Sequence, residues 1–501
     1  MRQLHLLSLL AILVATFGSA RAFAQEPNDD DDDGDALHNT QQPKQAEEPA
    51  PVLQAKPAAD ADTRPAEPKA PVEPTNTPAA GPKFGDTTIT GYLRGGFGAS
   101  NQKGRMTCFA LAIPGSLVSK YRLGNECEVW SETHFTTVVY AGGDGAVAHL
   151  HFMPTVYIPT TSIGYSPNGT TSSPEFTTAN GATVSFPNLY VDIQGIPWLA
   201  GGTVWAGSRY YKRESVYISD FFYWNPSGVG GGIEDIRLGK DLTLSYAAFA
   251  VDGEPVATGP SPSPSLPKQA NFGVRNDLQL RGIRPYAGGE FQVGLQYIAN
   301  YSNDEATHGG WGVTLQHVQK LLGGDNKLAF QYGRGGGTGF GTLSRFYYPD
   351  FSLRHELSEE RIRLVDVLTI QPTEWLGAQA VLVYQHDDLG TPGPGGKTDW
   401  YSAGTRVGYA FTEHAKLLGE VGLDRVKKNN GADPQWLAKF TIAPAITASR
   451  GFLARPEIRL FYTWAMWNEA ARTATVDSGR IYTTTNKLSG STIGLQAETW
   501  W

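Results

Sequence analysis

Three pairs of residues in this sequence combine an aromatic ring with an ionisable group two positions away. The pairs are Tyr92 with Arg94, Trp130 with Glu132, and Trp500 with Glu498. Residues two positions apart on a strand point to the same face, so each pair offers a flat apolar surface beside a charge. Such a surface suits the C–H face of a sugar, and the charge suits its hydroxyl rim. The alternative is ordinary packing inside the protein, and the spacing alone leaves both interpretations open.

Motifs of the common enzyme classes are missing from the sequence. There is no G-x-S-x-G turn, and His355-Glu356 is not completed to the H-E-x-x-H pattern. The glycine-rich run 333–341 precedes no helical pattern, so it predicts a flexible loop rather than a phosphate cradle. The ten histidines show no ligand-like spacing. We therefore predict no enzyme, no cofactor and no metal site, although catalytic residues on separate strands would escape such a search.

The elements that must position these groups are strands, because hydrophobicity alternates with period two. In 492–501, Ile493, Leu495 and Ala497 lie on one face, while Gln496 and Glu498 lie on the other. The same alternation recurs at 88–95, 376–385, 415–424 and 457–466. One face suits lipid and the other suits a water-filled lumen.

A soluble β-sandwich also alternates, but three features favour a transmembrane antiparallel β-barrel. The alternation runs from the start of the domain to its last residue, as a closed barrel requires. Aromatic residues cluster at strand ends, as at 221–224 and 500–501, which suits interfacial girdles. Long polar loops alternate with tight turns such as 323–326.

The first 83 residues differ from the rest. Residues 1–24 predict a signal peptide, with Arg2, an apolar stretch and Ala22-Phe23-Ala24 as the cleavage pattern. Residues 25–83 are acidic and rich in Pro and Ala, which predicts a disordered periplasmic extension. The interpretations left open are a spacer, an envelope anchor and an unselective solvated linker. The transmembrane β-barrel domain is predicted over 84–501.

Charge and cysteine content narrow the class of protein further. The formal charge is -8, and loss of Arg2 and Arg21 with the signal leaves -8 minus 2, or -10, for residues 25–501. That balance argues against nucleic-acid binding. The two cysteines, Cys108 and Cys127, predict one disulfide in an exported chain, with two free buried thiols as the alternative.

Five segments of the sequence closely resemble the maltoporin family (LamB-type porins). They are 91–94, 119–128, 205–213, 220–224 and 498–501. The block Ser-Lys-Tyr-Arg-Leu-Gly-Asn-Glu-Cys-Glu at 119–128 is the most specific. The resemblance covers about 84–501. It implies a homotrimer of barrels of about 18 strands in the bacterial outer membrane, with the third outer loop folded inward and a disulfide in the first.

The resemblance also implies passive diffusion of maltodextrins or related oligosaccharides along an aromatic slide and a polar track. Tyr92, Trp130 and Trp500 match slide positions. Polar-track and constriction positions are matched by Arg94, Arg122, Glu132, Arg213, Asp220 and Phe222. The expected partners are sugar, outer-membrane lipid and two further copies of the chain. A general porin is the alternative function, followed by an enzyme or adhesin on a barrel scaffold.

Several family positions carry other residues here. Phe222 stands where the family has its constriction tyrosine, which keeps the ring and loses the hydroxyl. Leu453 and Asp325 occupy two slide positions, with Phe452 next to the first. Ser215 replaces a track aspartate, and Glu214 precedes it. These departures leave the expected fold intact and put the identity of the sugar in question.

Overall fold

The computed structural model describes residues 82–111, 120–159, 176–177, 183–252, 272–302, 305, 307–339, 353, 355–474 and 487–501. The predicted signal peptide (1–24) and all but the last two residues of the predicted extension (25–83) lie outside this part of the chain. In the described residues, no helix combines the length and the apolar character needed to cross a membrane.

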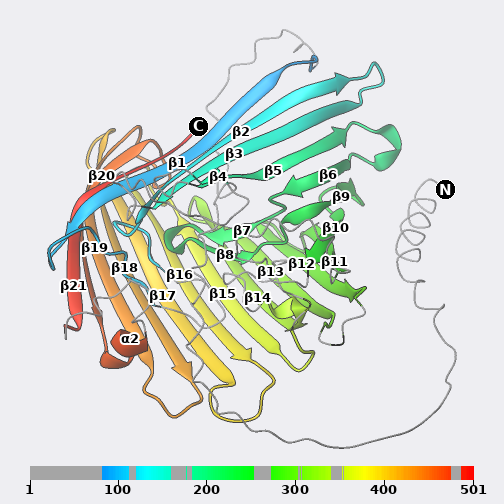
Figure 1. Ribbon diagram of the computed structural model, residues 1–501. Coiled ribbons are helices and arrows are strands. Elements are labelled where there is room, and N and C mark those ends of the chain that lie inside the picture. Colours follow the sequence, from blue (N-terminus) through cyan, green and yellow to red (C-terminus); the bar gives the residue numbers. More distant parts are fainter. Residues whose placement is uncertain are drawn as a thin grey trace, which may run out of the picture. The chain divides into compact units, whose positions relative to one another are not determined.

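The described chain forms a closed antiparallel barrel (Figure 1). The main sheet has 19 strands, and without the two-residue β4 (Phe176–Thr177), which pairs with β5, 18 remain to form the wall. The wall strands are β1 (Thr87–Ser100), β2 (Glu128–Ala141), β3 (Val147–Pro159), β5 (Thr183–Gln194), β6 (Thr203–Arg209), β9 (Gly228–Arg237), β10 (Thr243–Asp252), β11 (Phe272–Ile283), β12 (Gly289–Asn300), β13 (Gly310–Leu321), β14 (Gly324–Gly335), β15 (Glu360–Ile370), β16 (Leu376–Asp388), β17 (Lys397–Ala410), β18 (Ala415–Lys428), β19 (Gln435–Thr447), β20 (Glu457–Trp467) and β21 (Ser489–Trp500).

The barrel closes where its first and last strands pair. β1 runs antiparallel to β21 with Tyr92 opposite Trp500 and Ser100 opposite Thr492. Gly91 and Trp501 add two backbone hydrogen bonds, one in each direction, of 3.0 and 3.1 Å. A Cβ on Gly91 would lie 2.1 Å from the Trp501 ring, so only glycine lets that ring cover the seam. The predicted all-β barrel of about 18 strands is thus confirmed.

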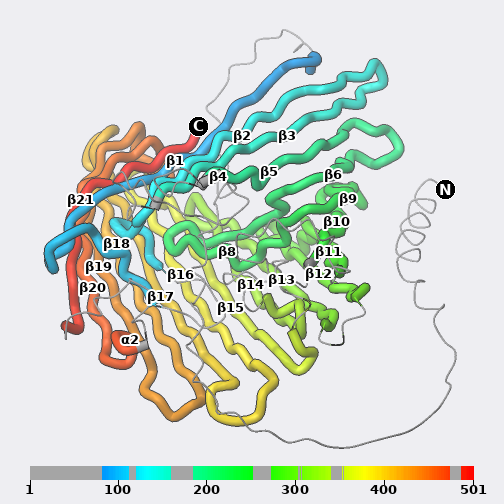
Figure 2. Tube along the Cα trace, viewed as in Figure 1, coloured from blue at the N-terminus to red at the C-terminus, as the bar shows by residue number. Residues whose placement is uncertain are grey.

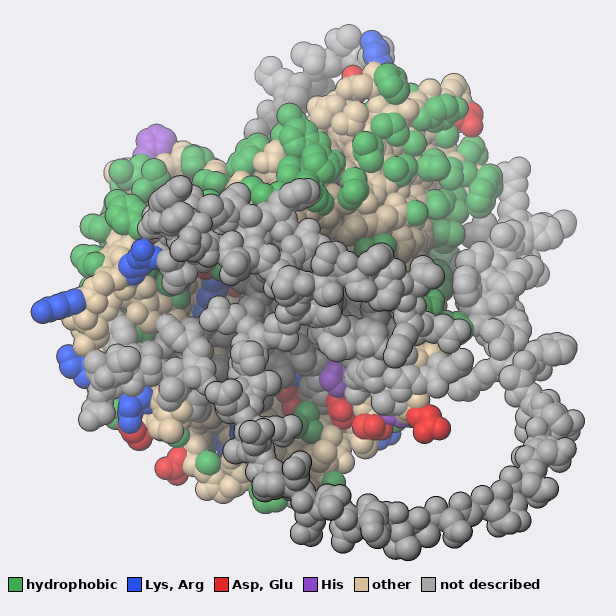
Figure 3. Space-filling model, viewed as in Figure 1, with side chains coloured by type: hydrophobic (Ala, Val, Ile, Leu, Met, Phe, Trp, Pro, Cys, Tyr) green, Lys and Arg blue, Asp and Glu red, His purple; other side chains and the backbone are tan. Residues whose placement is uncertain are grey.

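The barrel is apolar outside and charged inside, the reverse of a soluble protein. On β20, Leu460, Tyr462 and Trp464 are exposed, while the alternating Arg459 and Thr463 are buried. The same alternation holds on β16, β18 and β21. Hydrophobic side chains cover the outer wall over the first strands, at the upper right of Figure 3. The predicted assignment of the two faces is therefore correct.

Short and long connections alternate around the barrel. Segments 142–146, 322–323 and 411–414 join strands at one end, whereas the described residues 101–111, 120–127, 336–339 and 355–359 belong to longer connections at the other end (Figure 2). The predicted tight turn at 323–326 is shifted: it occupies Leu322 and Gly323, both with positive φ, and β14 starts at Gly324. Positive φ at both central residues matches the twist of a two-residue hairpin.

A segment between β6 and β9 packs against the inner wall. It contains β7 (Glu214–Val216), the 3-10 turn η4 (Tyr217–Ser219) and β8 (Phe221–Trp224). Its apolar side chains form one buried cluster with inward-facing residues of β14 to β20. Members include Val216, Ile218, Phe221, Tyr223, Trp224, Val365, Val367, Val381, Val383, Trp400, Val426, Leu437 and Trp467. This cluster is the largest apolar core of the described residues.

The remaining short elements of the described residues lie in the connections between strands. They are the 3-10 turns η3 (Pro197–Leu199) and η5 (Gly336–Thr338) and the helix α2 (Glu469–Ala474). The glycine-rich run predicted as a flexible loop differs from that prediction where it is described. Gly333 to Gly335 end β14, and Gly336 to Thr338 form a buried turn. A Cβ on Gly337 would lie 2.1 Å from the Trp311 carbonyl oxygen, so the glycine permits close backbone packing.

Candidate functional site

Strand register brings the predicted aromatic and charged residues together on one part of the inner wall. Tyr92 of β1 lies opposite Trp500 of β21 on one side and Glu132 of β2 on the other. Arg94 lies opposite Trp130 and Glu498 in the same way. Residues far apart in sequence therefore meet because β1 lies between β2 and the closing strand.

The three predicted slide rings belong to one aromatic cluster. Tyr92 and Trp500 are stacked with ring centroids 6.5 Å apart. Trp130 lies 5.9 Å from Tyr157, a ring that the sequence analysis did not select, and Tyr210 completes the cluster. Both Tyr157 and Tyr210 are only half-buried. In contrast, the side chains of Tyr92 and Trp130 are 6% and 4% exposed.

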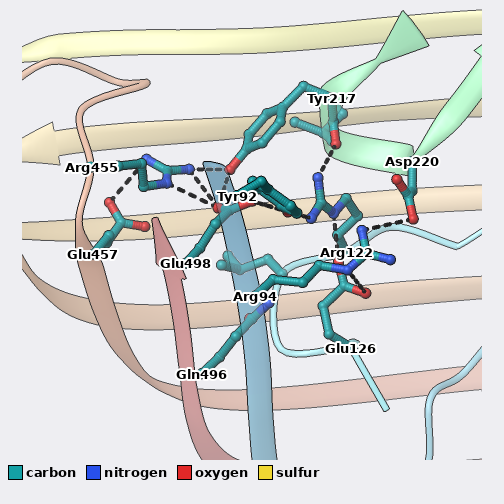
Figure 4. Close-up of polar contacts among 12 residues, drawn as sticks. Tyr92, Arg94, Arg122, Glu126, Tyr217, Asp220, Arg455, Glu457, Gln496 and Glu498 are labelled. Atoms are coloured by element: carbon teal, nitrogen blue, oxygen red, sulfur yellow. Dashed lines mark hydrogen bonds and ion pairs between the residues drawn. The ribbon is translucent and has the colours of Figure 1, made fainter. Parts of the chain in front are cut away.

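Arg94 is the centre of the first group of ion pairs. Its Nη2 donates to Glu128 at 2.9 Å and its Nη1 donates to Asp220 at 3.0 Å (Figure 4). Asp220 has a φ of 57°, which directs its carboxylate from η4 toward β1. Among the described residues, the other carboxylate oxygen of Asp220, Oδ1, is buried without a hydrogen-bond partner.

Arg122 links the first long connection, between β1 and β2, to the wall. Its Nε donates to Glu126 at 2.5 Å, and its Nη2 donates to the Tyr92 hydroxyl at 2.6 Å and to Glu498 at 3.1 Å. Burial would raise the pKa of the Glu126 carboxyl, but the attraction of Arg94, Lys120 and Arg122 outweighs it and holds that pKa well below its usual value. The surroundings of Glu126 therefore favour its ionised form.

Glu498 is the hub of the network in Figure 4, a role that the sequence analysis did not assign to it. Its carboxylate accepts hydrogen bonds from the Tyr92 hydroxyl at 2.9 Å and the Tyr217 hydroxyl at 2.5 Å. It also pairs with Arg455 at 2.8 Å and Arg459 at 2.5 Å. Only the Trp500–Glu498 spacing hinted at this role, since the partners come from separate connections and strands.

Arg213, Phe222 and Glu132 complete the predicted set. The Arg213 guanidinium lies over the rings of Tyr210, at 3.6 Å, and Phe222, at 4.8 Å. The ring retained at Phe222 thus contacts a cation even without a hydroxyl. Glu132 accepts a hydrogen bond of 2.9 Å from the indole of Trp130. All nine predicted residues are therefore joined through direct contacts in one region.

Glu214 is an acidic residue next to Ser215, which stands where the family has a track aspartate. It pairs with Arg281 of β11 at 3.1 Å and with Lys327 of β14 at 2.8 Å. Burial would raise the pKa of Glu214, but Lys327 and Arg281 outweigh it, and the pKa lies below its usual value. The other two departures lie elsewhere: Leu453 packs with Phe452 at the large apolar cluster, and Asp325 pairs with Lys320.

A cavity of about 160 Å³ lies next to the aromatic cluster. Its lining combines rings, hydrogen-bonding groups and charges: Thr90, Gly91, Tyr92, Glu132, His134, Met153, Asn188, Tyr190, Arg209 and Tyr210. Arg209 pairs with Glu234 at 2.7 Å. The cavity thus offers both an apolar surface and donors and acceptors to a small polar molecule.

The predicted disulfide between Cys108 and Cys127 is present. It closes the first long connection next to the block that carries Arg122 and Glu126. Asn125 secures the same connection by donating a hydrogen bond of 2.8 Å to the Phe109 carbonyl oxygen. The disulfide therefore helps to hold Arg122 against the wall.

The histidines are closer in space than their spacing in the sequence suggested. The donor atoms of His149, His151 and Asp192 lie within 4.8 Å of one another on the inner wall. No ligand-like spacing is recognised in the sequence for this group. The signal was present in the two-residue spacing of His149 and His151, which puts both on one face of a strand.

Comparison with known proteins gives a family match and several solved barrels. The sequence profile of the LamB porin family matches residues 87–501. OccAB1 of Acinetobacter baumannii is 10% identical, with a TM-score of 0.45, 84% of this chain covered and 98% of that one. OpdK of Pseudomonas aeruginosa is 12% identical, with a TM-score of 0.43 and coverage of 83% and 99%. The trimer form of OmpT of Vibrio cholerae is 9% identical, with a TM-score of 0.37 and coverage of 84% and 100%.

Proposed function

This chain belongs to the LamB porin family and forms an outer-membrane β-barrel, and on that premise we propose that it is a sugar-selective channel. Maltodextrins or related oligosaccharides diffuse through it passively. The observation that carries the proposal is the meeting of stacked aromatic rings and a charge network on one part of the inner wall. Selectivity then comes from the pore lining, with sites weak enough to release the sugar.

The rings supply the apolar half of a sugar site. Trp130 and Tyr157 form one pair of neighbours, and Tyr92, Trp500 and Tyr217 form another group. An aromatic face suits the C–H face of a pyranose ring, and a succession of rings lets the sugar move from one to the next. Tyr157 and Trp500 are half-buried and keep part of their surface accessible.

The charged residues supply the polar half. A sugar hydroxyl both donates and accepts, so a track with carboxylates and guanidiniums side by side matches it. Asp220 contributes a carboxylate oxygen, Oδ1, that has no hydrogen-bond partner among the described residues. A hydroxyl that donates to this oxygen would satisfy it, and hydrogen bonds to charged groups are worth about 1.5–3 kcal/mol.

The segment 210–227 is the natural constriction of this channel. It is the third of the long connections in chain order, and it contacts inward-facing residues of three separate strands. Tyr223 donates to Gln316 of β13 at 2.6 Å, Ile218 donates its N–H to Gln379 of β16 at 2.9 Å, and Tyr217 reaches Glu498 of β21. These contacts support an inward-folded third outer loop that narrows the pore.

The homotrimer expected from the family is part of the same proposal. Native mass spectrometry of the detergent-extracted protein should give three times the mass of the mature chain. A monomeric mass under conditions that keep the barrel folded would contradict it.

Planar-bilayer conductance tests the function. Maltotriose or sucrose should reduce the ion current in a saturable manner. Trp130→Ala should raise the half-blocking sugar concentration, whereas Trp464→Ala, which removes an outward-facing ring of β20, should leave it unchanged. Equal effects of the two substitutions would count against a slide at Trp130.

A general porin is the second candidate, and one observation favours it. Tyr92 and Trp130 are almost completely buried, and the ionisable groups around them bond mainly to one another. Ion current that no sugar reduces would support the general porin. A folded protein without any current would favour an enzyme or adhesin on a barrel scaffold.

A further inference from the structure

We propose that His149, His151 and Asp192 form an exchangeable site for a divalent transition-metal ion such as Zn²⁺ on the inner wall of the barrel. The Nδ1 atom of His149 lies 2.8 Å from Oδ1 of Asp192, and Nε2 of His151 lies 2.9 Å from Oδ2. Two imidazole nitrogens thus converge on a single carboxylate. None of the three belongs to the aromatic cluster or the charge network of the proposed sugar path, although Tyr190 and His134, which contact His151, line the cavity beside that cluster.

Strand geometry fixes the three side chains on one face. His149 and His151 are alternate residues of β3 and so point to the same side. The register of β3 with β5 puts Asp192 opposite His149 and Tyr190 opposite His151. This side is the interior, because Leu150 and Val191, which point the other way, are exposed on the outer wall.

Neighbouring groups hold His151 in a ligating orientation. Its ring stacks on Tyr190 with centroids 4.2 Å apart and planes within 3°. Its second nitrogen, Nδ1, lies 3.2 Å from Nε2 of His134 and 3.3 Å from the hydroxyl of Thr136. A metal-bound histidine characteristically donates its other N–H to such an acceptor, which fixes the tautomer. His151 therefore has the surroundings of a ligand.

The donor set selects the class of ion. Imidazole nitrogen together with one carboxylate favours Zn²⁺, Cu²⁺ or Ni²⁺ over Ca²⁺ and Mg²⁺, which prefer oxygen ligands. Metal–ligand distances of about 2.0–2.1 Å place tetrahedral donors roughly 3.3 Å apart. The donor atoms lie within 4.8 Å of one another, so rotation of the side chains brings them to an ion. Three protein ligands leave a fourth position open to water, which suits an exchangeable ion.

The site lies near the end of the barrel that carries the short turns. The turn 142–146 joins β2 to β3 shortly before His149, and β5 ends at Gln194, two residues after Asp192. A bound ion adds two positive charges to this end of the lumen. Zn²⁺ binding should therefore alter the ion current whichever sugar the channel carries. The proposed metal site does not depend on the identity of that sugar.

The test uses the full-length protein in detergent and Zn²⁺ as the probe. After incubation with Zn²⁺ and desalting, elemental analysis should find one ion per chain more in the wild type than in H149A/H151A. The matched control is His386→Ala, because His386 pairs with Asp399 at 2.8 Å and forms a single histidine–carboxylate pair. This control should retain the ion. Equal Zn²⁺ content in the wild type and the double variant would overturn the proposal.

A titration with a conservative variant guards against misfolding of the double variant. Asp192→Asn keeps the size and one oxygen acceptor but loses the anionic ligand. By calorimetry it should bind Zn²⁺ at least tenfold more weakly, and His134→Ala should weaken binding by about 10–100-fold through loss of support for His151. Ca²⁺ and Mg²⁺ in excess should not compete. Unchanged Zn²⁺ affinity in Asp192→Asn, or displacement by Ca²⁺, would show that the three residues form only a hydrogen-bonded group.

Discussion

The rings of Tyr92 and Trp500 stack across the seam that closes the barrel, with centroids 6.5 Å apart and planes inclined by 18°. Their backbones are paired in the same place, since Tyr92 lies opposite Trp500 in the β1–β21 register. One residue pair therefore takes part both in closing the wall and in lining the proposed sugar path. Substitutions at Tyr92 can separate these two roles.

Tyr92→Phe keeps the ring and removes the hydroxyl, which accepts from Arg122 and donates to Glu498. Arg122 and Glu498 still pair directly at 3.1 Å, so we expect a loss of about 1–2 kcal/mol in the free energy of unfolding. Sugar block of the current should stay unchanged, because the ring remains. Denaturant unfolding and sugar titration in bilayers measure the two effects.

Tyr92→Ala should lose both the stability and the sugar block. If Tyr92→Phe abolishes sugar block as fully as Tyr92→Ala does, the hydroxyl and not the ring contacts the sugar. That outcome would remove Tyr92 from the proposed slide and leave it in the polar track.

Asp220→Asn tests the carboxylate whose Oδ1 has no hydrogen-bond partner among the described residues. Asn accepts the positive φ of 57° at this position, so the backbone should be preserved. We expect the half-blocking sugar concentration to rise by about tenfold, corresponding to about 1.4 kcal/mol, as an ionic hydrogen bond becomes a neutral one. Asp235→Asn is the matched control, since Asp235 has the same φ and lies half-exposed beside Lys212. A tenfold rise in both variants would contradict a specific role for Asp220.

Acid should loosen the segment 210–227 through Glu214. Its carboxyl pKa is lower in the folded protein than its usual value of 4.5. A group of this kind stabilises the folded state fully above its unfolded pKa, and the contribution disappears as the pH falls through the folded pKa. Channel conductance should therefore be constant from neutral pH down to about pH 5 and change only below about pH 4.5.

Glu214→Gln is the variant that isolates this effect. It should shift the neutral-pH conductance toward the acid value of the wild type and flatten the acid-induced change. Glu413→Gln, at an exposed pair with Arg450, should leave the pH profile as it is. A wild-type change centred near pH 7 would mean that a different group controls the segment.

The disulfide should be detectable and should stabilise the first long connection. Alkylation without reductant should add no mass, whereas alkylation after reduction should label both cysteines. The double substitution of Cys108 and Cys127 by Ala removes a bridge that spans 19 positions. The chain-entropy relation gives about 3 kcal/mol for such a loop. An unchanged unfolding midpoint would show that other contacts already order the connection.

The alternation of residue types was enough to predict the wall and its two faces. β16, β18 and β20 bury alternate residues, as at Arg459, Phe461 and Thr463, so a local pattern determines the face of a side chain on these strands. Once closure is assumed, β1 must lie between β2 and β21, and this order explains why Tyr92, Trp130 and Trp500 meet on the inner wall.

The connections were less predictable, because their contacts depend on tertiary packing. Arg122, Tyr217 and Arg455 reach Glu498 from three different connections, and no local pattern marks such a meeting point. The histidine group was hard to predict for a different reason. Its three members lie on two strands, and the two-residue spacing of His149 and His151 becomes informative only with the register of β3 and β5.

Trp501 exchanges two backbone hydrogen bonds with Gly91 and covers it with its ring. The two strands of this seam, β1 and β21, stand at opposite ends of the strand order in the sequence, so the wall cannot be sealed before β21 is in place. A product cut short by a premature stop within β21 would carry two open sheet edges, which invite aggregation. The seam thus makes closure a long-range event, since every other pair of wall strands joins neighbours in chain order, whereas this pair joins the first wall strand to the last.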